Sequence, residues 1–343
     1  MHRGHRRTVQ GSDSDYVVEE IRWIGRKCLR KAARCPTPPT DDRQARHMGM
    51  NRSLDHPRDI LRAAGVRPRH ALGQNFLVSP QNLDRIVEAA RIESDDVVLE
   101  IGTGLGTLTA RLSARAHAVV SVEIDERLYR TACSRLAESR NVKLICADFL
   151  ASKHRINPEV EAAVLGCRGE RRVKVVANLP YQISSPAVVN LLEWKVPLAE
   201  IDVMLQLEVS ERITACPGEA AYGPLTVFCT YHAEAERLFT LPPSAFWPRP
   251  AVSSSFLRIT PCLPKHHAED YQVFSEVVNR LLQSRRKTLA RAFEVAWGRA
   301  EARLVLEKLR LDPALRPGEL AVADFVRIAN VFTSYGAEQA TPP

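Results

Sequence analysis

The residue types best suited to chemistry stand in the tetrapeptide Asn178-Leu179-Pro180-Tyr181, directly after the apolar run 173–177. This run predicts a buried strand, and substrates of doubly wound sheets react at the carboxyl ends of such strands. The Asn178 side-chain oxygen and the Leu179 carbonyl can accept both hydrogens of an exocyclic adenine amine and turn its lone pair towards an electrophile. Pro180 fixes the turn, and Tyr181 offers a face for a flipped base. The alternative is an ordinary Asn-containing turn beside a buried tyrosine.

A second set of residues has the spacing of a nucleotide-binding site. Gly102, Gly104 and Gly106 follow the apolar run 97–101, which is typical of the strand, tight turn and helix that open such a sheet. Glu123 ends the next predicted strand, 21 residues after Gly102. A carboxylate there can accept from both ribose hydroxyls of a dinucleotide or adenosyl cofactor.

Asp148 stands just past the third predicted strand, 142–146. Its carboxylate can accept from the amino group of a cofactor's adenine, with Phe149 packed nearby. The alternative is that Asp148 caps the N-terminus of a helix.

Alternating strands and helices must position these residues. Strands are expected over 97–101, 118–122, 142–146, 173–177, 201–207 and 254–259, and helices over 79–91, 108–115, 126–137 and 184–194. Residues 153–172 are interpreted as a surface excursion. The pattern predicts an α/β fold with a Rossmann-like, mostly parallel sheet.

The regions outside this pattern have a different character. Residues 1–65 are expected to be a basic, poorly ordered extension with one candidate helix over 16–33. Residues 66–260 would form the sheet domain, and residues 264–343 a small all-helical domain. A proline-braced loop, 242–250, presents Phe246 as a second face for stacking a base.

Composition limits the function classes. With 343 residues and 45% hydrophobic content, the chain can bury one large and one smaller core. No apolar run is long enough to span a membrane, no leader pattern is recognisable, and the expected location is cytoplasmic. The eight cysteines lack zinc-type spacing, so reduced thiols and no metal are expected.

The net charge of +8 is unevenly distributed. Residues 1–70 contain sixteen Lys and Arg against eight Asp and Glu, and residues 280–310 contain nine against three. Either these flanks are solvated basic surfaces or they contact a phosphate backbone.

Seven motifs in order resemble the KsgA-type small-subunit ribosomal RNA adenine dimethyltransferases, from Gly73 to about Leu289. The motifs are Gly73-Gln74-Asn75-Phe76-Leu77, Glu100 to Gly106, Val122 to Asp125, Ala177 to Tyr181, Glu208 to Arg212, Phe246 to Pro250 and Arg285-Arg286-Lys287-Thr288-Leu289. The resemblance implies a seven-stranded sheet, S-adenosylmethionine as methyl donor, and N6,N6-dimethylation of two adjacent adenosines near the 3′ end of small-subunit (16S) rRNA during ribosome maturation.

Residue roles follow from the resemblance where the motifs match. It places cofactor contacts on Asn75, Leu77, Gly102, Glu123, Asp148 and Asn178, and base-holding groups on Asn178, Leu179, Tyr181 and Phe246. From the residues themselves, Gly104 joins the cofactor turn. With the substrate that the resemblance implies, Arg285, Arg286 and Lys287, together with the basic N-terminal arm, are expected to hold rRNA phosphates. The expected partner is rRNA within the 30S subunit or its precursor, bound by a monomer.

Some positions depart from the family pattern. This chain has Thr103, Gln182, Leu207 and Pro224 where the family usually has Pro, Asn, Lys and Arg, respectively. At 251–254 it has Ala-Val-Ser-Ser where the family usually has Lys-Val-Asp-Ser. None of these changes removes an expected cofactor contact, whereas the lost basic residues would weaken RNA contacts.

Three rival functions share parts of the pattern. A macrolide-resistance methylase acting on large-subunit rRNA shares the fold and the tetrapeptide, but the Arg285–Leu289 and Phe246–Pro250 motifs favour the small-subunit enzyme. An RNA-binding factor without turnover would not need an intact 178–181 motif with Glu123 and Asp148. A nicotinamide dehydrogenase has no use for an amine-holding tetrapeptide.

Overall fold

The computed structural model describes residues 56–340, within one compact unit that spans residues 54–343. The helix expected over 16–33 lies outside the described residues. Of the expected extension, 1–65, the described part forms helix α2 (Pro57–Ala63), whose Ile60 and Leu61 are buried against Leu105 and Leu128.

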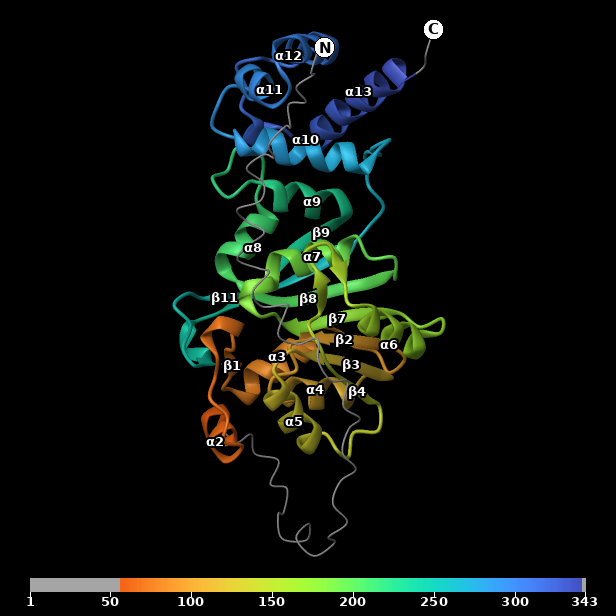
Figure 1. The fold of residues 1–343 in the computed structure, drawn as a ribbon. Coiled ribbons are helices and arrows are strands. Elements are labelled where there is room, and N and C mark those ends of the chain that lie inside the picture. The colour runs from red at the N-terminus through yellow and green to blue at the C-terminus, as the bar shows by residue number, and fades with distance from the viewer. Residues whose placement is uncertain (1–55, 341–343) are drawn as a thin grey trace, which may run out of the picture. The chain divides into compact units, whose positions relative to one another are not determined.

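A seven-stranded sheet has the order β4-β3-β2-β7-β8-β11-β9 (Figure 1). Its strands are β2 (Val97–Ile101), β3 (Ala118–Glu123), β4 (Val142–Cys146), β7 (Val173–Asn178), β8 (Leu198–Gln206), β9 (Ala233–Leu241) and β11 (Ser254–Pro261). Neighbouring strands from β4 to β8 are parallel, and β11 is antiparallel to both β8 and β9. The expected mostly parallel Rossmann-like sheet is confirmed.

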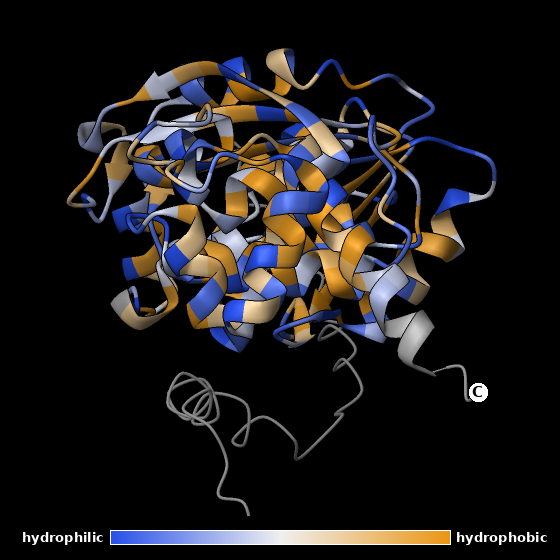
Figure 2. Ribbon diagram, turned by 90° about the horizontal axis from the view of Figure 1, so that it is seen from above, coloured by the Kyte–Doolittle hydropathy of each residue, from blue (hydrophilic) through white to orange (hydrophobic). Residues whose placement is uncertain are grey.

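Helices cover both faces of this sheet because its strands are apolar on both sides. They are α3 (Pro80–Ala89), α4 (Thr107–Ser113), α5 (Glu126–Arg135), α6 (Pro158–Arg168), α7 (Ser184–Leu192), α8 (Leu207–Thr214) and α9 (Pro224–His232). Along β2, Val97 and Leu99 belong to the core that includes α6 and α7, whereas Val98 belongs to the core that includes α3 and α4. Figure 2 shows hydrophobic and hydrophilic residues mixed along the helices, as expected for helices with one buried side.

The interpretation of residues 153–172 as a surface excursion is wrong, because most of this stretch is α6. Asn157 caps the helix by accepting from the backbone N–H of Glu159, and Pro158 occupies its first turn. Val160 and Val164 are buried in the sheet core. Only the short hairpin of β5 (Leu150–Ser152) and β6 (Arg155–Ile156) lies outside the main sheet and its helices.

The C-terminal part is helical, as expected. Its helices are α10 (Tyr271–Gln283), α11 (Leu289–Trp297), α12 (Arg299–Leu309) and α13 (Val322–Ala340), drawn in blue in Figure 1. Their core also contains Tyr222 and Phe228, so α9 belongs to this cluster as well as to the sheet. No helix within residues 56–340 has the length and apolar character to cross a membrane.

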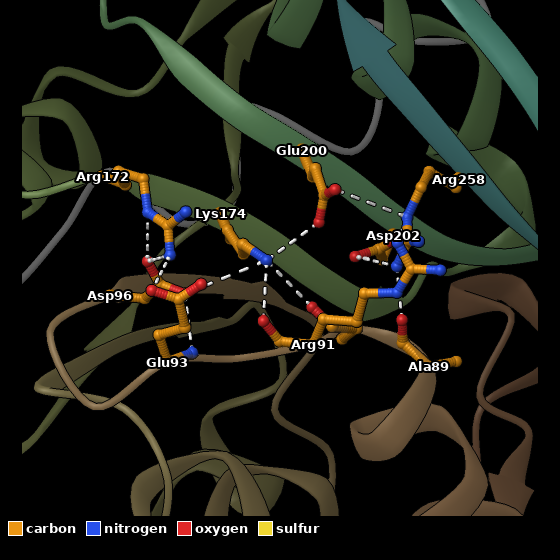
Figure 3. Close-up of polar contacts among 10 residues, drawn as sticks. Ala89, Arg91, Glu93, Asp96, Arg172, Lys174, Glu200, Asp202 and Arg258 are labelled. Atoms are coloured by element: carbon orange, nitrogen blue, oxygen red, sulfur yellow. Dashed lines mark hydrogen bonds and ion pairs between the residues drawn. The ribbon is translucent and has the colours of Figure 1, made fainter.

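Charged residues are buried near the amino ends of the parallel strands, away from the Asn178 end of β7 (Figure 3). The Lys174 ammonium lies 2.9 Å from Glu200 and 3.9 Å from Asp96, and it also donates to two backbone carbonyls at the end of α3. Arg258 pairs with Asp202 at 2.9 Å. Burial raises the pKa of Asp202 to about 6, against the opposing effect of Arg258. Because every cation faces a carboxylate, this buried cluster ties β7, β8 and β11 together.

Candidate active site

The glycine turn packs directly against the tetrapeptide that follows β7. Gly102, Gly104 and Gly106 have φ values of 86°, 57° and 72°, a backbone region that residues with a side chain rarely adopt. A Cβ atom at Gly102 would lie only 3.3 Å from the Pro180 ring. The two motifs singled out from the sequence therefore form one site.

Glu123, at the end of β3, is joined to the same turn. Its two carboxylate oxygens accept from the backbone N–H groups of Gly104 at 2.8 Å and Asp125 at 2.9 Å. Burial raises the pKa of Glu123, while these two hydrogen bonds oppose the rise. Each oxygen keeps a further lone pair, so the carboxylate can also accept from hydroxyl groups.

Asp148 lies beyond the end of β4, the strand next to β3 in the sheet. It does not cap a helix, because residue 150 begins β5 and the Asp148 carboxylate accepts from the Leu150 N–H at 3.0 Å. Desolvation raises the pKa of Asp148. The second carboxylate oxygen is available as an acceptor at this edge of the sheet.

Asn178 ends β7, and its amide orientation is fixed by the chain before α3. Its Nδ2 donates to the backbone carbonyl of Asn75 at 2.9 Å, and Asn75 in turn donates from its own Nδ2 to the Gly73 carbonyl at 3.1 Å. A carbonyl only accepts, so the nitrogen of Asn178 must face Asn75. The Asn178 Oδ1 is thereby turned away from Asn75 and presented as an acceptor.

The main chain after Asn178 is also fixed. Leu179 donates its N–H to the Met204 carbonyl at 3.2 Å, and its side chain is buried. The Pro180 carbonyl accepts from the Ser184 hydroxyl at 3.1 Å. Helix α7 begins at Ser184 itself, with Ile183 as its N-cap, so it starts earlier than the expected Ser-Ser-Pro cap.

The Tyr181 ring is held by a residue from a distant strand. Its hydroxyl lies 2.8 Å from the hydroxyl of Ser254, which starts β11 and is fully buried. Burial raises the pKa of Tyr181, and the Ser254 contact opposes the rise. The tyrosine therefore stays a neutral hydroxyl at physiological pH.

Phe246 and Leu77 form a pair between two short strands, β1 (Phe76–Leu77) and β10 (Phe246–Trp247). Phe246 is only 3% exposed and belongs to the core of one sheet face. Its expected use as a stacking face stays a prediction, which requires this covered ring to open.

The comparisons with known proteins agree with this geometry. A sequence model described as ribosomal RNA adenine dimethylase matches residues 65–334. A relative from Pelotomaculum thermopropionicum, named Ribosomal RNA small subunit methyltransferase A, is 38% identical over 287 residues, which is 82% of this chain and 97% of the relative. The chain belongs to the ribosomal RNA adenine dimethylase family.

Further similarities fit this family. A Ribosomal RNA small subunit methyltransferase A from Pediococcus pentosaceus is 35% identical, with 82% of this chain and 97% of the relative covered. The crystal structure of a dimethyladenosine transferase from Plasmodium falciparum superposes with a TM-score of 0.61 at 24% identity, over 76% of this chain and 98% of that chain, and it supports the fold. As a member of the family, the chain is an S-adenosylmethionine-dependent rRNA adenine dimethyltransferase.

The residues of this dimethylase fit the cofactor of its family. Glu123 is a buried carboxylate at the end of β3, and Asp148 is a more exposed carboxylate just past the adjacent strand β4. They suit ribose hydroxyls and an adenine amino group, respectively. The positive-φ glycines keep side chains out of the turn beside them.

The basic turn between α10 and α11 is separate from this site, and its residues have different roles. Arg285 donates to the backbone carbonyls of Ala220 at 3.0 Å and Tyr222 at 2.9 Å, so its guanidinium holds the chain before α9. Arg286 and Lys287 are exposed. The structure thus assigns a structural contact to one of the three cations expected to contact RNA.

Sequence reasoning gave no site role to three residues that organise the dimethylase site. Ser254 contacts Tyr181, while Gln74 and Asp125 are hydrogen-bonded to each other at 3.2 Å. Gln74 and Asp125 stand inside recognised motifs, which was a usable signal. The contact between Ser254 and Tyr181 depends on tertiary packing and has no local sequence signal.

Proposed function

We propose that this chain methylates N6 of two adjacent adenosines near the 3′ end of 16S rRNA, twice each, to give N6,N6-dimethyladenosine during maturation of the small subunit. The observation that carries the proposal is the hydrogen bond from Asn178 to Asn75 beside the glycine turn. It fixes an amide oxygen at the carboxyl end of β7, where the site needs an acceptor for an amine.

The cofactor would be held by residues from three strand ends. Gly102 and Gly104 form the turn after β2, and the Asn75–Leu77 segment lies beside it. Glu123 and Asp148 would accept from the ribose and the adenine of the cofactor. Bound there, S-adenosylmethionine supplies an electrophilic methyl group on a sulfonium ion. Membership of the family and the spacing of these residues support this assignment.

The chain's own contribution to the reaction is positioning and polarisation. Asn178 Oδ1 and the Leu179 carbonyl accept the two hydrogens of the adenine amine and direct its lone pair away from the ring. Tyr181 stacks on the base, with Phe246 as the opposite face once exposed, while Pro180 fixes the turn. The amine proton becomes acidic on methylation and leaves to water, so no strong general base is required.

The proposed partner is small-subunit rRNA within the 30S particle or its precursor, bound by a cytoplasmic monomer. Arg286 and Lys287 are exposed in the turn that follows α10, and phosphate contacts of this kind give salt-dependent binding. The proposed domains are the methyltransferase domain, residues 66–260, and the helical RNA-binding domain, residues 264–343, with residues 1–65 as a basic extension.

The test is mass spectrometry of nucleosides from ribosomal subunits that lack the modification, after incubation with the protein and labelled S-adenosylmethionine. Label is expected in N6,N6-dimethyladenosine of the small subunit, and it should disappear with Asn178→Ala. Label confined to the large subunit would contradict the proposal in favour of a resistance methylase. Cofactor binding without label in either subunit would instead indicate an RNA-binding protein without turnover.

A further inference from the structure

The loop before β1, residues 69–75, contacts both the end of β3, at Asp125, and the segment after β7, at residues 178–182. Gly73 has a φ of +61°, and a Cβ atom there would lie 2.0 Å from the Gln182 side chain and 3.0 Å from the Tyr181 nitrogen. At its other end, the Asn75 carbonyl holds the Asn178 amide. The loop therefore touches the tetrapeptide at two points, and its position decides how Asn178 is oriented.

Gln74 anchors this loop with both ends of its side-chain amide. Its Oε1 accepts from the backbone N–H of Arg69 at 2.8 Å, which closes the loop on itself. Its Nε2 donates to the Asp125 carboxylate at 3.2 Å, which ties the loop to the end of β3. Both the donor and the acceptor of the amide are used, so the hydrogen-bond partners specify a glutamine.

Asp125 is a rigid anchor for this contact. It is 3% exposed and caps α5 by accepting from the Arg127 N–H. The Arg127 guanidinium lies 2.8 Å from its carboxylate, and Arg69 lies 3.7 Å away. Its backbone N–H donates to Glu123, so the same residue contacts both the expected ribose-binding carboxylate and the loop.

We propose that Gln74 is a positioning residue for methyl transfer: it latches the 69–75 loop to Asp125 so that the Asn75 carbonyl holds Asn178 with its oxygen towards the substrate amine. The inference rests on the proposed function for the identity of that amine. Through this contact between Gln74 and Asp125, which we call the latch, the orientation of the Asn178 side chain depends on the end of β3, the strand that carries Glu123.

The chemistry of the latch suggests an exchange experiment. Gln74→Glu keeps the shape and the acceptor for Arg69, but it sets a second carboxylate against Asp125. Asp125→Asn alone presents an amide N–H₂ to the donor of Gln74. The double variant Gln74→Glu/Asp125→Asn restores a donor facing an acceptor with the polarity reversed, and it keeps the summed charge of the pair unchanged.

The rate of a single turnover of methylation, measured on unmodified small subunits, reports how well Asn178 is oriented for methyl transfer. Gln74→Glu is expected to lower the maximal rate about tenfold, while the subunit concentration that gives half of this rate changes less than about twofold, because a misplaced amine acceptor affects the transition state. The double variant should lose clearly less than the product of the two single losses, as coupled residues do, although Asp125→Asn also removes the carboxylate that faces Arg127. Gln272→Glu, the same change at an exposed position on α10, should have no effect.

Two outcomes would overturn the latch. One is a double variant whose rate loss equals the product of the two single losses, because independent damage multiplies. The other is a Gln74→Glu variant that unfolds at lower temperature but keeps the wild-type rate, because that pattern shows a structural role alone.

Calorimetric titration with S-adenosylhomocysteine separates this proposal from the proposed function. Asn75 and Asn178 are expected cofactor contacts, so Gln74→Glu should weaken binding several-fold and the double variant should restore it. If the wild-type protein methylates neither subunit, the proposed function fails while this binding pattern still supports the latch. Equal affinity in all variants would contradict the latch whatever the RNA assay shows.

Discussion

The side-chain amide of Asn178 donates a 2.9 Å hydrogen bond to the backbone carbonyl of Asn75, which stands 103 positions earlier in the chain. This contact joins the end of β7 to the loop before β1. Because a carbonyl cannot donate, the contact also determines which way the amide points. The orientation of one side chain, rather than a titrating base, is the feature on which the proposed chemistry depends.

Replacing Asn178 by aspartate tests that orientation with almost no change in shape. A carboxylate has no hydrogen to donate, so an oxygen would face the Asn75 carbonyl and repel it. We expect the methylation rate in a single turnover to fall by about 100-fold or more, as when one preorganised catalytic hydrogen bond is lost. Asn279→Asp is the matched control, because Asn279 also donates to a backbone carbonyl but is exposed on α10. A rate within about threefold of wild type would argue against the assigned role.

Gly73 and Gly65 form a matched pair for the close approach of the loop to the tetrapeptide. Both have positive φ, at +61° and +64°, but only at Gly73 would a Cβ atom meet other atoms. Alanine should cost each position about 1 kcal/mol of stability from backbone strain. Gly73→Ala should in addition reduce methylation strongly, whereas Gly65→Ala should not. Denaturant unfolding and the methylation assay separate the two effects, and equal activity of the two variants would contradict the close contact.

Most of the sheet could be predicted from the sequence because its local signals are strong. The runs 97–101, 118–122, 142–146 and 173–177 are apolar except for one residue each, and each forms a parallel strand. For residues 153–172 the prediction of a surface excursion is wrong, because charged residues obscure the helical periodicity of α6. There, Asn157-Pro158 followed by Val160, Ala163 and Val164 was the local signal for a capped, half-buried helix.

The candidate site was predicted in its parts but not in its connections. Asn178, Glu123 and the glycine turn could be placed at strand ends by spacing alone. The contacts of Gln74 with Asp125 and of Tyr181 with Ser254 join residues 51 and 73 positions apart. Such pairs depend on how strands are ordered and on loop conformation, which local periodicity does not encode.

Removing the Ser254 hydroxyl tests whether it orients the Tyr181 ring. Ser254→Ala leaves the tyrosine hydroxyl without its partner, and Tyr181→Phe leaves the serine without its own. Each change should reduce kcat/KM about threefold to tenfold, in line with one hydrogen bond of about 1 kcal/mol. The double variant should lose no more than either single variant. Losses that multiply in the double variant would show that the two hydroxyls act independently.

Lys174 should be essential to the buried charged cluster of β7, β8 and β11. Lys174→Met removes a cation that is 5% exposed in its side chain and leaves Glu200 and two backbone carbonyls without this donor. The free energy of unfolding in urea should fall by about 3–5 kcal/mol, as for other broken buried ion pairs. Lys195→Met, at an exposed position, should change it by less than about 0.5 kcal/mol. A small loss at Lys174 would mean that water compensates the cluster.

Glu100 gives the fold a distinctive dependence on pH. It is 1% exposed and accepts from the Thr109 and Ser121 hydroxyls, both at 2.6 Å. Burial raises the pKa of Glu100 from 4.5 to about 8. The folded protein therefore holds a proton that the unfolded chain releases as the pH rises above about 4.5. Stability from this residue is fully present below that pH and is lost as the pH approaches about 8.

Glu100→Gln should remove this dependence, because glutamine stays neutral and can still accept from both hydroxyls. The difference in unfolding free energy between the variant and the wild type should then shift in favour of the variant by up to about 1.4 kcal/mol for each unit of pH. Urea unfolding at intervals between about pH 5 and about pH 8 measures that slope, and other titrating groups cancel in the difference. Glu88→Gln, the same change on the exposed side of α3, is the matched control. A flat difference for Glu100→Gln would show that the buried carboxyl is already ionised, with its charge stabilised by the two hydroxyls.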